Sequence, residues 1–434
     1  KLLFVLAFAI PAAAIVYLVP RFEWHAPVVK LNLASNSVGL RPFDIEVRDE
    51  GRGLATVTVT LSAGGVDYPL FIEHYGSGTV KEKKITLALT ADKIAAKDGP
   101  AVLQVKARDR SYWRLFRGNE AALEKNIVLD RTPPKLELVS DDPYVNFGGS
   151  GVVIYRMSPD AQKSGVRVAR YFFPGYKIKE PDQYVVFFAH PYDLDRTDKA
   201  WIVAEDEAGN TGEMNLAYTL KGVRYKKSTI AIDDEFIAAK AAPLLGADRS
   251  SERSLKDAFL KVNRDLRKTN EETIKALCAK SNAQILWRGP FQQLRNSKVE
   301  ANFADERTYV YQGETIGRAY DVGFYLAVTK NAALEAPNSG VVVFAADLGI
   351  YGNTVILDHG MGVFTLYSHL SAIDVKTGGA VKQKEIIGKN GETGLAAGDH
   401  LHYATLIHGV PVLPIEWWDG KWIKDNVQSK LEDL

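Results

Sequence analysis

The chain has 434 residues, enough for about two to four domains that each bury a core. Its 54 Lys and Arg nearly balance its 53 Asp and Glu, so it lacks the positive net charge that is typical of nucleic-acid-binding proteins, and we expect no nucleic-acid partner. The single cysteine, Cys278, excludes an internal disulfide framework and a zinc site built from cysteines, and its helix-like surroundings predict a packed thiol.

The N-terminal stretch KLLFVLAFAIPAAAIVYLVP carries no charge after Lys1. Its length matches the ~20 residues that cross a bilayer as a helix, so we predict a membrane anchor at residues 1–20. The small residues of PAAA also fit a cleavage site, and a cleaved signal peptide is the alternative. Because the apolar run continues past these alanines to Leu18, we favour an uncleaved anchor.

After this segment the chain has the pattern of an all-β region. Short runs that alternate apolar and polar residues, such as ATVTVTLSA at 55–63, are separated by turns that contain Gly or Asp. The prolines Pro133 and Pro134 mark a boundary between a first module, residues 28–130, and a second module, residues 131–222. Both modules are predicted to be β-sandwiches.

The two modules end alike. VKARDRSYWR at 105–114 and VAEDEAGNTG at 203–212 each place an Asp in a turn after a β run. The second of these resembles the closing strand and turn of bacterial immunoglobulin-like modules. That resemblance implies two immunoglobulin-like domains that act as spacers or adhesive units rather than as catalysts.

Residues 223–289 are predicted to form a helical linker or arm. Between Asp233 and Gln284, apolar residues recur at intervals of three and four, with Ser and Asp at positions suited to helix caps. The charged faces are most simply solvated surfaces, although such an arm could also contact a partner or cover a site.

Histidines gather in the last part of the chain, which is again β-rich and Gly-rich. Five of them fall within fifty residues: His359, His369, His400, His402 and His408. A strand sends alternate side chains to the same face, so His400 and His402 of GDHLHYATL are expected to point the same way and could share one metal ion or substrate. We interpret His359 and His408, each in a turn, as structural or surface residues.

Three sequence blocks follow one another around these histidines: YGNTVILDHGMGVFTLYSHLS, VKTGGAVKQKEIIGKNGETG and GDHLHY. They resemble the lysostaphin/LytM-type zinc metallopeptidases, which cleave peptidoglycan cross-links or bridges. The similar domain corresponds to residues 290–422, followed by a tail at 423–434. The resemblance implies a β-sheet groove that holds zinc and takes peptidoglycan as its partner.

Three histidines match functional positions of this family. The resemblance implies that His402 is a zinc ligand, and that His369 and His400 are catalytic residues that assist the attacking water and the developing oxyanion. These roles suit imidazole chemistry. A neutral imidazole ligates zinc, bound zinc lowers the pKa of water toward ~7, and a nearby imidazole can move protons near neutral pH.

The upstream metal motif departs from the family. The pattern H-x-G-x-D-x-A falls on DVGFYLA, so Asp321 stands in place of the ligand His and Tyr325 in place of the ligand Asp. Gly323 and Ala327 are in register. A carboxylate can ligate zinc, but a neutral phenol with a reference pKa of about 10 is a poor ligand. A metal site would consist of His402, Asp321 and Tyr325.

These changes favour a domain that keeps the groove but has a degenerate metal site. The expected protein spans the inner membrane once, has its bulk in the periplasm, and binds peptidoglycan or regulates a cell-wall hydrolase. One alternative is an active zinc-dependent peptidoglycan endopeptidase with an unusual Asp/Tyr/His site. Another is a structural subunit of a larger envelope complex.

The expected fold is mainly β and multidomain. It combines an N-terminal transmembrane helix, two immunoglobulin-like β-sandwiches, a helical segment and a C-terminal LytM-like β-sheet groove domain. Near the C-terminus, EWWDGKWI contributes three tryptophans that we expect to pack a domain edge: Trp417, Trp418 and Trp422.

Overall fold

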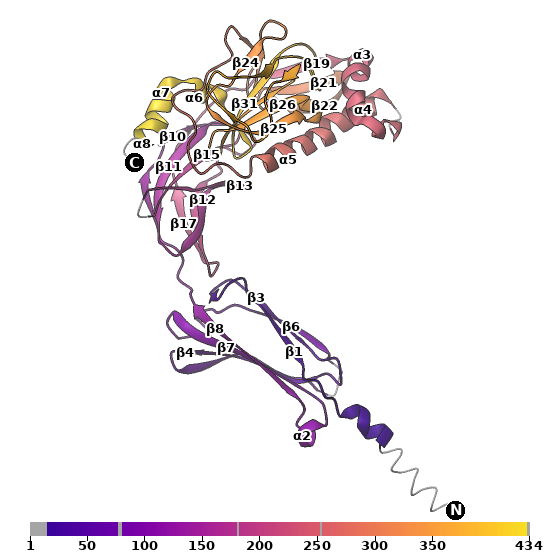
Figure 1. Cartoon of the computed structure of the whole chain (residues 1–434), viewed down its shortest axis with the longest axis vertical. Coiled ribbons are helices and arrows are strands. Elements are labelled where there is room, and N and C mark those ends of the chain that lie inside the picture. Colours follow the sequence, from indigo (N-terminus) through magenta and orange to yellow (C-terminus); the bar gives the residue numbers. More distant parts are fainter. Residues whose placement is uncertain (1–14, 77–79, 180–181, 252–253, 432–434) are drawn as a thin grey trace, which may run out of the picture. The chain divides into compact units, whose positions relative to one another are not determined.

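The structure is a computed structural model that describes residues 15–76, 80–179, 182–251 and 254–431 (Figure 1). The chain divides into two units. The first consists of Lys1–Lys135, Pro159–Gln162 and Ala204–Gly212. The second consists of Leu136–Ser158, Lys163–Val203 and Glu213–Leu434.

Two sheets enclose the core of the first unit. Their strands are β1 Val28–Asn32, β2 Ser37–Val38, β3 Phe43–Arg48, β4 Leu54–Ala63, β5 Val66–His74, β6 Glu82–Leu87, β7 Gly99–Asp109 and β8 Glu120–Leu129. One sheet has the order β1-β3-β6 and the other β2-β8-β7-β4-β5. Along β4, Val57, Val59 and Leu61 alternate with more exposed residues and are fully buried. The alternation read from the sequence therefore does form this core.

The shared ending of the two modules has a common hydrogen-bond pattern. The Asp109 carboxylate accepts the backbone N–H of Asn119 at 2.7 Å, and the Asp206 carboxylate accepts that of Asn210 at 2.8 Å. In both pairs the Asn side chain also donates to the same carboxylate at 2.9 Å. The aspartates therefore fix turns, which agrees with a structural reading of both motifs. Whether the modules are immunoglobulin-like stays a prediction.

A second β-module follows the boundary prolines. Its strands are β9 Leu136–Ser140, β10 Tyr144–Asn146, β11 Ser150–Met157, β12 Ala161–Val168, β13 Tyr171–Pro174, β14 Tyr176–Lys179, β15 Gln183–Ala189, β16 Ala200–Asp206, β17 Thr211–Leu216 and β18 Thr219–Lys221. They form sheets of order β14-β15-β11-β9, β13-β12-β16-β17 and β10-β18. The mainly β character expected for this part of the chain is confirmed.

The predicted arm is helical over most of its length. Its helices are α3 Asp234–Phe236, η2 Ile237–Ala241, η3 Ala242–Ser251, α4 Leu255–Lys261, η4 Val262–Leu266 and α5 Arg267–Leu277. We call residues 234–277 the helical arm. The side chains of Asp233 and Ser254 accept backbone N–H groups at the starts of α3 and α4, as N-caps do.

One part of the predicted arm is a strand. Lys227–Ile232 forms β19, which pairs in parallel with β21, Glu306–Tyr311. The pairing partner lies far along the chain, and only the folded domain brings it close. The helices begin at Asp234, next to Asp233 where the helical spacing begins in the sequence, and β19 lies in the first part of residues 223–289.

The C-terminal domain is built on one large sheet. The remaining strands are β20 Lys298–Ala301, β22 Glu314–Tyr320, β23 Phe324–Ala327, β24 Ala333–Glu335, β25 Gly340–Asp347, β26 Asn353–Asp358, β27 Val363–Ser368, β28 Ala372–Ile373, β29 Ala380–Val381, β30 Ile386–Lys389, β31 Leu401–Ile407 and β32 Val410–Val412. The large sheet has the order β20-β23-β31-β27-β26-β25-β29, with β32 beside β31. Smaller sheets are β19-β21-β22 and β24-β30-β28.

The two faces of the large sheet pack against different layers. On one face, Leu357, Tyr367 and Tyr403 belong to the core of the domain itself. On the other face, Leu366 and Ala404 belong to a second apolar cluster that includes side chains of the helical arm. Because side chains alternate along a strand, this second face is the one to which His402 of β31 points.

The C-terminus packs against the second β-module. Helices α6 Pro414–Trp418, α7 Gly420–Ile423, η6 Lys424–Gln428 and α8 Ser429–Leu431 close the chain. Trp417 is fully buried, and its Nε1–H donates to Ser150 Oγ at 3.1 Å. Lys430 donates to the carbonyl oxygen of Val152 at 2.8 Å. In its described part the predicted tail is helical, and polar contacts with the β-module hold it.

Within the residues that the structure describes, no helix has both the length and the apolar character needed to cross a bilayer. Most of the predicted anchor, residues 1–14, lies outside the described residues.

Candidate functional site

Three histidines meet on one side of β31. His402 lies in this strand, where its Cα pairs with those of Tyr325 in β23 and Ser368 in β27. His400 lies just before the strand. The ring centroids of His369 and His400 are 4.9 Å apart, and those of His369 and His402 are 6.0 Å apart. The structure thus brings together the three histidines that the sequence predicts for the site.

The three imidazoles are neutral and only partly hydrogen-bonded. His369 Nδ1 lies 2.8 Å from the carbonyl oxygen of Thr393, and His400 Nδ1 lies 2.8 Å from that of Gly398. Each Nδ1 therefore carries the proton that it donates. Burial lowers the pKa of His369 to about 3, and it lowers the pKa of His400 and of His402 as well.

Some of the imidazole nitrogens have no partner. In the described part of the chain, His400 Nε2 and both ring nitrogens of His402 are buried without a hydrogen bond. An unprotonated imidazole nitrogen is the form that binds a metal ion, accepts a proton or accepts a hydrogen bond. The site therefore keeps acceptor groups that the surrounding protein does not use.

Asp321 is already paired with a cation. Its Oδ2 lies 2.8 Å from Nη2 of Arg307, which enters from β21, and the Asp321 side chain is 4% exposed. The same guanidinium lies 4.3 Å from the centre of the Tyr325 ring. Burial raises the pKa of Asp321 to about 6, although the charge of Arg307 and a hydrogen bond from Tyr325 oppose that rise. These three side chains form one interlocked cluster.

Tyr325 joins this cluster to the histidines. Its ring stacks on that of His400 with centroids 4.4 Å apart, and it lies 5.3 Å from the ring of His402. Burial and the neighbouring charge of Asp321 raise the pKa of the Tyr325 phenol above its ordinary value. A protonated phenol donates a hydrogen bond to Asp321 and is a poor metal ligand.

Residues 319–414 match the family model described as Peptidase family M23. This span contains Asp321, Tyr325 and the three site histidines. The chain carries a peptidase family M23 domain. The lysostaphin/LytM-type resemblance of the sequence is thereby confirmed, and the domain occupies the C-terminal part of the chain.

Curated relatives are similar to a part of the chain. The peptidoglycan DD-endopeptidase ShyA of Vibrio cholerae is 44% identical over 90 residues, which are 21% of each chain. The DD-carboxypeptidase/endopeptidase Mpg of Neisseria meningitidis is 42% identical over 93 residues, again 21% of each chain. The chain therefore spans about a fifth of the length of these relatives.

A solved structure is also similar to a part of the chain. The catalytic domain of lysostaphin from Staphylococcus simulans has a TM-score of 0.26 and 25% sequence identity. The match covers 30% of this chain and 98% of that chain.

The M23 domain of this chain does not fit a zinc ion held by three protein ligands. Catalytic zinc sites usually have about three such ligands and an open position for water. Here His402 is available, but Asp321 is engaged by Arg307 and Tyr325 is protonated. Among the described residues, the M23 domain holds no group of three His, Cys, Asp or Glu side chains with ligand atoms within 4.8 Å of one another.

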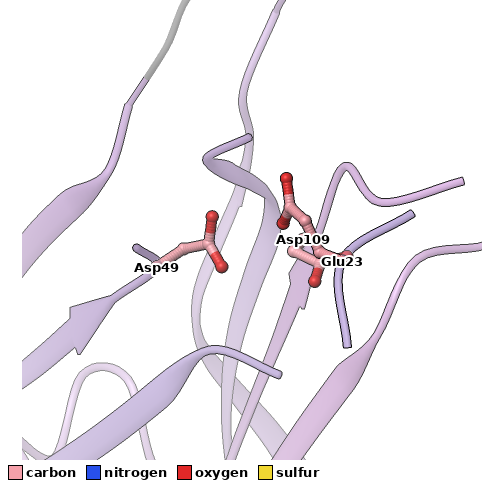
Figure 2. Close-up of side chains that lie close together, drawn as sticks. All are labelled: Glu23, Asp49 and Asp109. Atoms are coloured by element: carbon pink, nitrogen blue, oxygen red, sulfur yellow. The ribbon is translucent and has the colours of Figure 1, made fainter. Parts of the chain in front are cut away.

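A group of that kind does occur in the first unit. Carboxylate oxygens of Glu23, Asp49 and Asp109 lie within 4.8 Å of one another (Figure 2). The two aspartates accept backbone N–H groups, Asp49 from Gly53 at 2.6 Å and Asp109 from Asn119 at 2.7 Å. These donors satisfy the aspartates as part of the turns that they fix.

The helical arm covers the sheet face that carries His402. Phe259 and Ile274 of the arm belong to one buried apolar cluster with Leu366 of β27 and Leu406 of β31. Asn270 of α5 accepts the backbone N–H of Ile350 at 2.9 Å, which holds the arm to the rim of the sheet. The sheet face that carries His402 was expected to form the floor of a groove. In this chain it is instead part of a packed core.

Two small cavities lie beside the site among the described residues. A cavity of about 40 Å³ lies among Arg267, Arg307, Asp321 and His402. A second cavity of about 220 Å³ extends from His402 along Leu406 to Glu271 of α5. Ligand pockets commonly measure about 300–1,000 Å³. Both cavities are smaller than this, so a peptide at His402 would need more room than they give.

The other candidate residues have structural roles. His359 is fully buried, with Nδ1 2.7 Å from the carbonyl oxygen of Ser339 and Nε2 2.7 Å from Thr365 Oγ1. His408 Nε2 lies 3.2 Å from the hydroxyl of Tyr176. Both histidines are buried, so the expectation of structural roles agrees with their contacts, but neither lies at the surface.

Arg307 is the site residue that sequence reasoning missed. It lies in ERTYVY, an ordinary alternating strand, and it reaches Asp321 because β21 and β22 form an antiparallel pair. The available signal was an arginine in β21, the strand that precedes β22, and β22 leads into the altered metal motif. Arg267 of the arm was also missed, because its place beside His402 depends on how the arm packs.

Proposed function

We propose that the protein is a single-pass inner-membrane protein with its bulk in the periplasm. Its M23 domain binds peptidoglycan or regulates a cell-wall hydrolase and does not itself cut peptidoglycan. The observation that carries this proposal is the ion pair between Arg307 and Asp321. The guanidinium neutralises the one carboxylate of the expected ligand set, and its charge opposes the entry of a divalent cation.

The family match and the N-terminal sequence support the cell envelope as the location. Of the curated relatives named above, ShyA is a peptidoglycan DD-endopeptidase by name and Mpg is a DD-carboxypeptidase/endopeptidase by name. Residues 1–20 are apolar after Lys1 and have the length of a membrane span. An anchored chain of this kind would present its M23 domain to the cell wall.

The histidines have a use in a binding protein. A peptidoglycan stem peptide offers amide N–H groups, and the unpartnered nitrogens of His400 and His402 accept hydrogen bonds. Access requires the helical arm to leave the sheet face. The arm is therefore the element whose movement would couple binding to regulation.

The proposal is tested by metal analysis and by digestion of isolated sacculi with the purified full chain. We expect substoichiometric zinc and no release of soluble peptidoglycan fragments. A triple variant, Asp321→His, Tyr325→Asp and Arg307→Met, restores the family ligands and removes the competing cation, so we expect it to bind zinc. The matched control is Asp321→His with Tyr325→Asp, which keeps Arg307 and should bind zinc more weakly.

One observation favours the alternative of an active zinc endopeptidase. His402 is fully buried by its surroundings, yet neither of its ring nitrogens has a partner in the described residues, as in a ligand that awaits a metal. Stoichiometric zinc in the wild-type chain, together with sacculus digestion that is lost on chelation and on His402→Ala, would establish this alternative and overturn the proposal.

A further inference from the structure

Aromatic side chains gather at the end of the first unit where the chain enters it. Helix η1, Val19–Arg21, leads to this end, and α2, Trp113–Phe116, projects from it (Figure 1). We call the following set the aromatic patch: Phe22, Trp24, Tyr112, Trp113, Leu115 and Phe116. Its rings contact one another, with centroid distances of 4.4 Å for Trp24 and Trp113 and 5.0 Å for Tyr112 and Phe116.

The outer members of the patch are exposed. Trp24 is 75% exposed, Leu115 is 88% exposed and Phe116 is 70% exposed. Single exposed apolar residues are common on protein surfaces, but a contiguous group of large ones marks a surface that meets another apolar phase.

The backbone holds these side chains outward. Arg114, Leu115 and Phe116 have φ of 52°, 57° and 68°, a left-handed conformation that non-Gly residues rarely adopt. The turn is fixed at its base, because the N–H of Tyr112 donates to the carbonyl of Arg21 at 2.8 Å. A strained, anchored turn that displays leucine and phenylalanine suggests a function for their exposure.

Exposed arginines lie beside the patch. Arg114 and Arg117 are exposed, and within the described residues neither forms an ion pair. The guanidinium of Arg52 lies 4.5 Å from the centre of the Tyr112 ring. The nearby carboxylates of Asp49 and Asp109 are buried and accept backbone N–H groups. The carboxylate of Glu23, between Phe22 and Trp24, is half-buried, so Arg114 and Arg117 are more exposed than any of these three acidic side chains. The surface is both aromatic and cationic.

We propose that the aromatic patch is seated in the headgroup layer of the membrane, against anionic phospholipid. This inference rests on the proposed membrane anchoring. The patch is continuous in sequence with the apolar run of residues 1–20, which ends one residue before Arg21. Tryptophan, tyrosine and arginine are the side chains that favour the membrane interface, because each joins an apolar part to a polar or charged one. This contact would hold the first unit at the membrane surface.

The test uses the full chain reconstituted into vesicles, with a solvent-sensitive fluorophore on Leu115→Cys. The matched control is Val66→Cys, which is 52% exposed at the β4–β5 turn, on the other end of the same sheet. Cys278 is fully buried, so it should not react with the fluorophore reagent. Wild-type chain treated with the same reagent checks this. A second label on Trp24→Cys covers the case in which one variant folds poorly.

With vesicles that contain phosphatidylglycerol, we expect the labels at 115 and 24 to shift to shorter emission wavelength. Nitroxide lipids should quench them at least threefold more than the label at 66. The effect should weaken in vesicles of phosphatidylcholine alone. Equal, water-like emission at 115, 24 and 66 in chains that float with the vesicles would overturn the patch inference and leave the anchoring intact. Chains that do not float would instead overturn the anchoring.

A glycan strand is another surface that aromatic side chains can meet. A shift of the label at 115 on addition of isolated sacculi, without lipid, and none with vesicles would overturn the membrane assignment in favour of the cell wall.

Discussion

Arg307 places a fixed positive charge beside Asp321, and this pair decides the chemistry of the site. We expect Arg307→Met to lower the free energy of unfolding by about 3 kcal/mol, because loss of one partner leaves a buried carboxylate unpaired. The matched control is Arg318→Met on the next strand, since Arg318 is 70% exposed and pairs with Glu306 at 3.6 Å. It should cost less than about 1 kcal/mol. Urea denaturation measures both, and equal losses would contradict the role of Arg307.

The histidines of the site were predictable, and their neighbours were not. His400 and His402 were expected to face the same way because they are two apart in a β-like run, which is a local property of the sequence. The cluster around Asp321 depends on the pairing of β21 with β22 and on the packing of the arm. Both are non-local, so a single sequence offers no direct sign of them.

At the scale of elements, helix α6 joins the M23 domain to the second β-module through a buried glutamate. Glu416 accepts the amide N–H of Asn146 at 2.7 Å and the backbone N–H of Ser150 at 2.8 Å. Burial raises the pKa of Glu416 to about 7, from an ordinary 4.5. A group with a raised folded-state pKa stabilises the fold fully below its unfolded value, and this contribution is lost as the pH rises through the folded value.

The stability of the second unit should therefore fall, on account of Glu416, between about pH 4.5 and pH 7. The pKa difference corresponds to roughly 3 kcal/mol. The variant Glu416→Gln lacks this titration. The unfolding free energy of wild type minus that of the variant should therefore fall by about that amount between pH 4.5 and about pH 8. Tryptophan fluorescence in urea follows the transition. Glu314→Gln, at a side chain that is 68% exposed, is the control, and parallel pH profiles for wild type and Glu416→Gln would contradict the assignment.

The helical arm should be the first part of the second unit to open. Phe259 is fully buried in the apolar cluster that the arm shares with the large sheet, and its ring lies 5.1 Å from that of Tyr309 in β21. We expect Phe259→Ala to lower stability by about 3–5 kcal/mol and to speed hydrogen exchange of α5 amides more than those of β27. Leu357→Ala, on the opposite face, should instead affect both elements alike. Uniform exchange in Phe259→Ala would show that arm and sheet open together.

The helical arm and the strand before it show which secondary-structure elements could be predicted from the sequence. The helices of the arm were predictable from apolar spacing and from caps such as Ser254. Strand β19 was not, because its parallel partner β21 is distant in sequence and its own six residues fit either context. The sequence did not predict that the helical arm packs onto the M23 sheet, because the apolar face of an amphipathic helix does not show which element it packs against.

At the scale of the whole molecule, the alternating runs and the histidine blocks were enough to predict a mainly β chain with a peptidase-like C-terminal domain. The grouping of the parts was harder to predict. The second β-module, the arm and the M23 domain form one unit, and contacts such as those of Glu416 and Trp417 join them. These are single polar and aromatic contacts that follow no periodic pattern, so the sequence does not predict them.

The proposed topology makes a whole-molecule prediction. If the apolar run at residues 1–20 anchors the chain with its bulk in the periplasm, proteinase K added to spheroplasts should digest a C-terminal tag, whereas inverted membrane vesicles should protect it. Phe8→Lys with Ile10→Lys adds two charges to the middle of the run. Each costs about 2.5–3.5 kcal/mol at the centre of a membrane helix, so we expect the variant to lose membrane association.

Tyr17→Lys is the matched control for that variant. It adds a charge near the end of the apolar run, where a lysine can extend its ammonium to the membrane surface, so membrane association should persist. The control separates the effect of charge from the effect of its depth. A wild-type tag that resists protease in spheroplasts but is digested in inverted vesicles would contradict the periplasmic placement, because the same anchor would then hold the M23 domain on the side away from the cell wall.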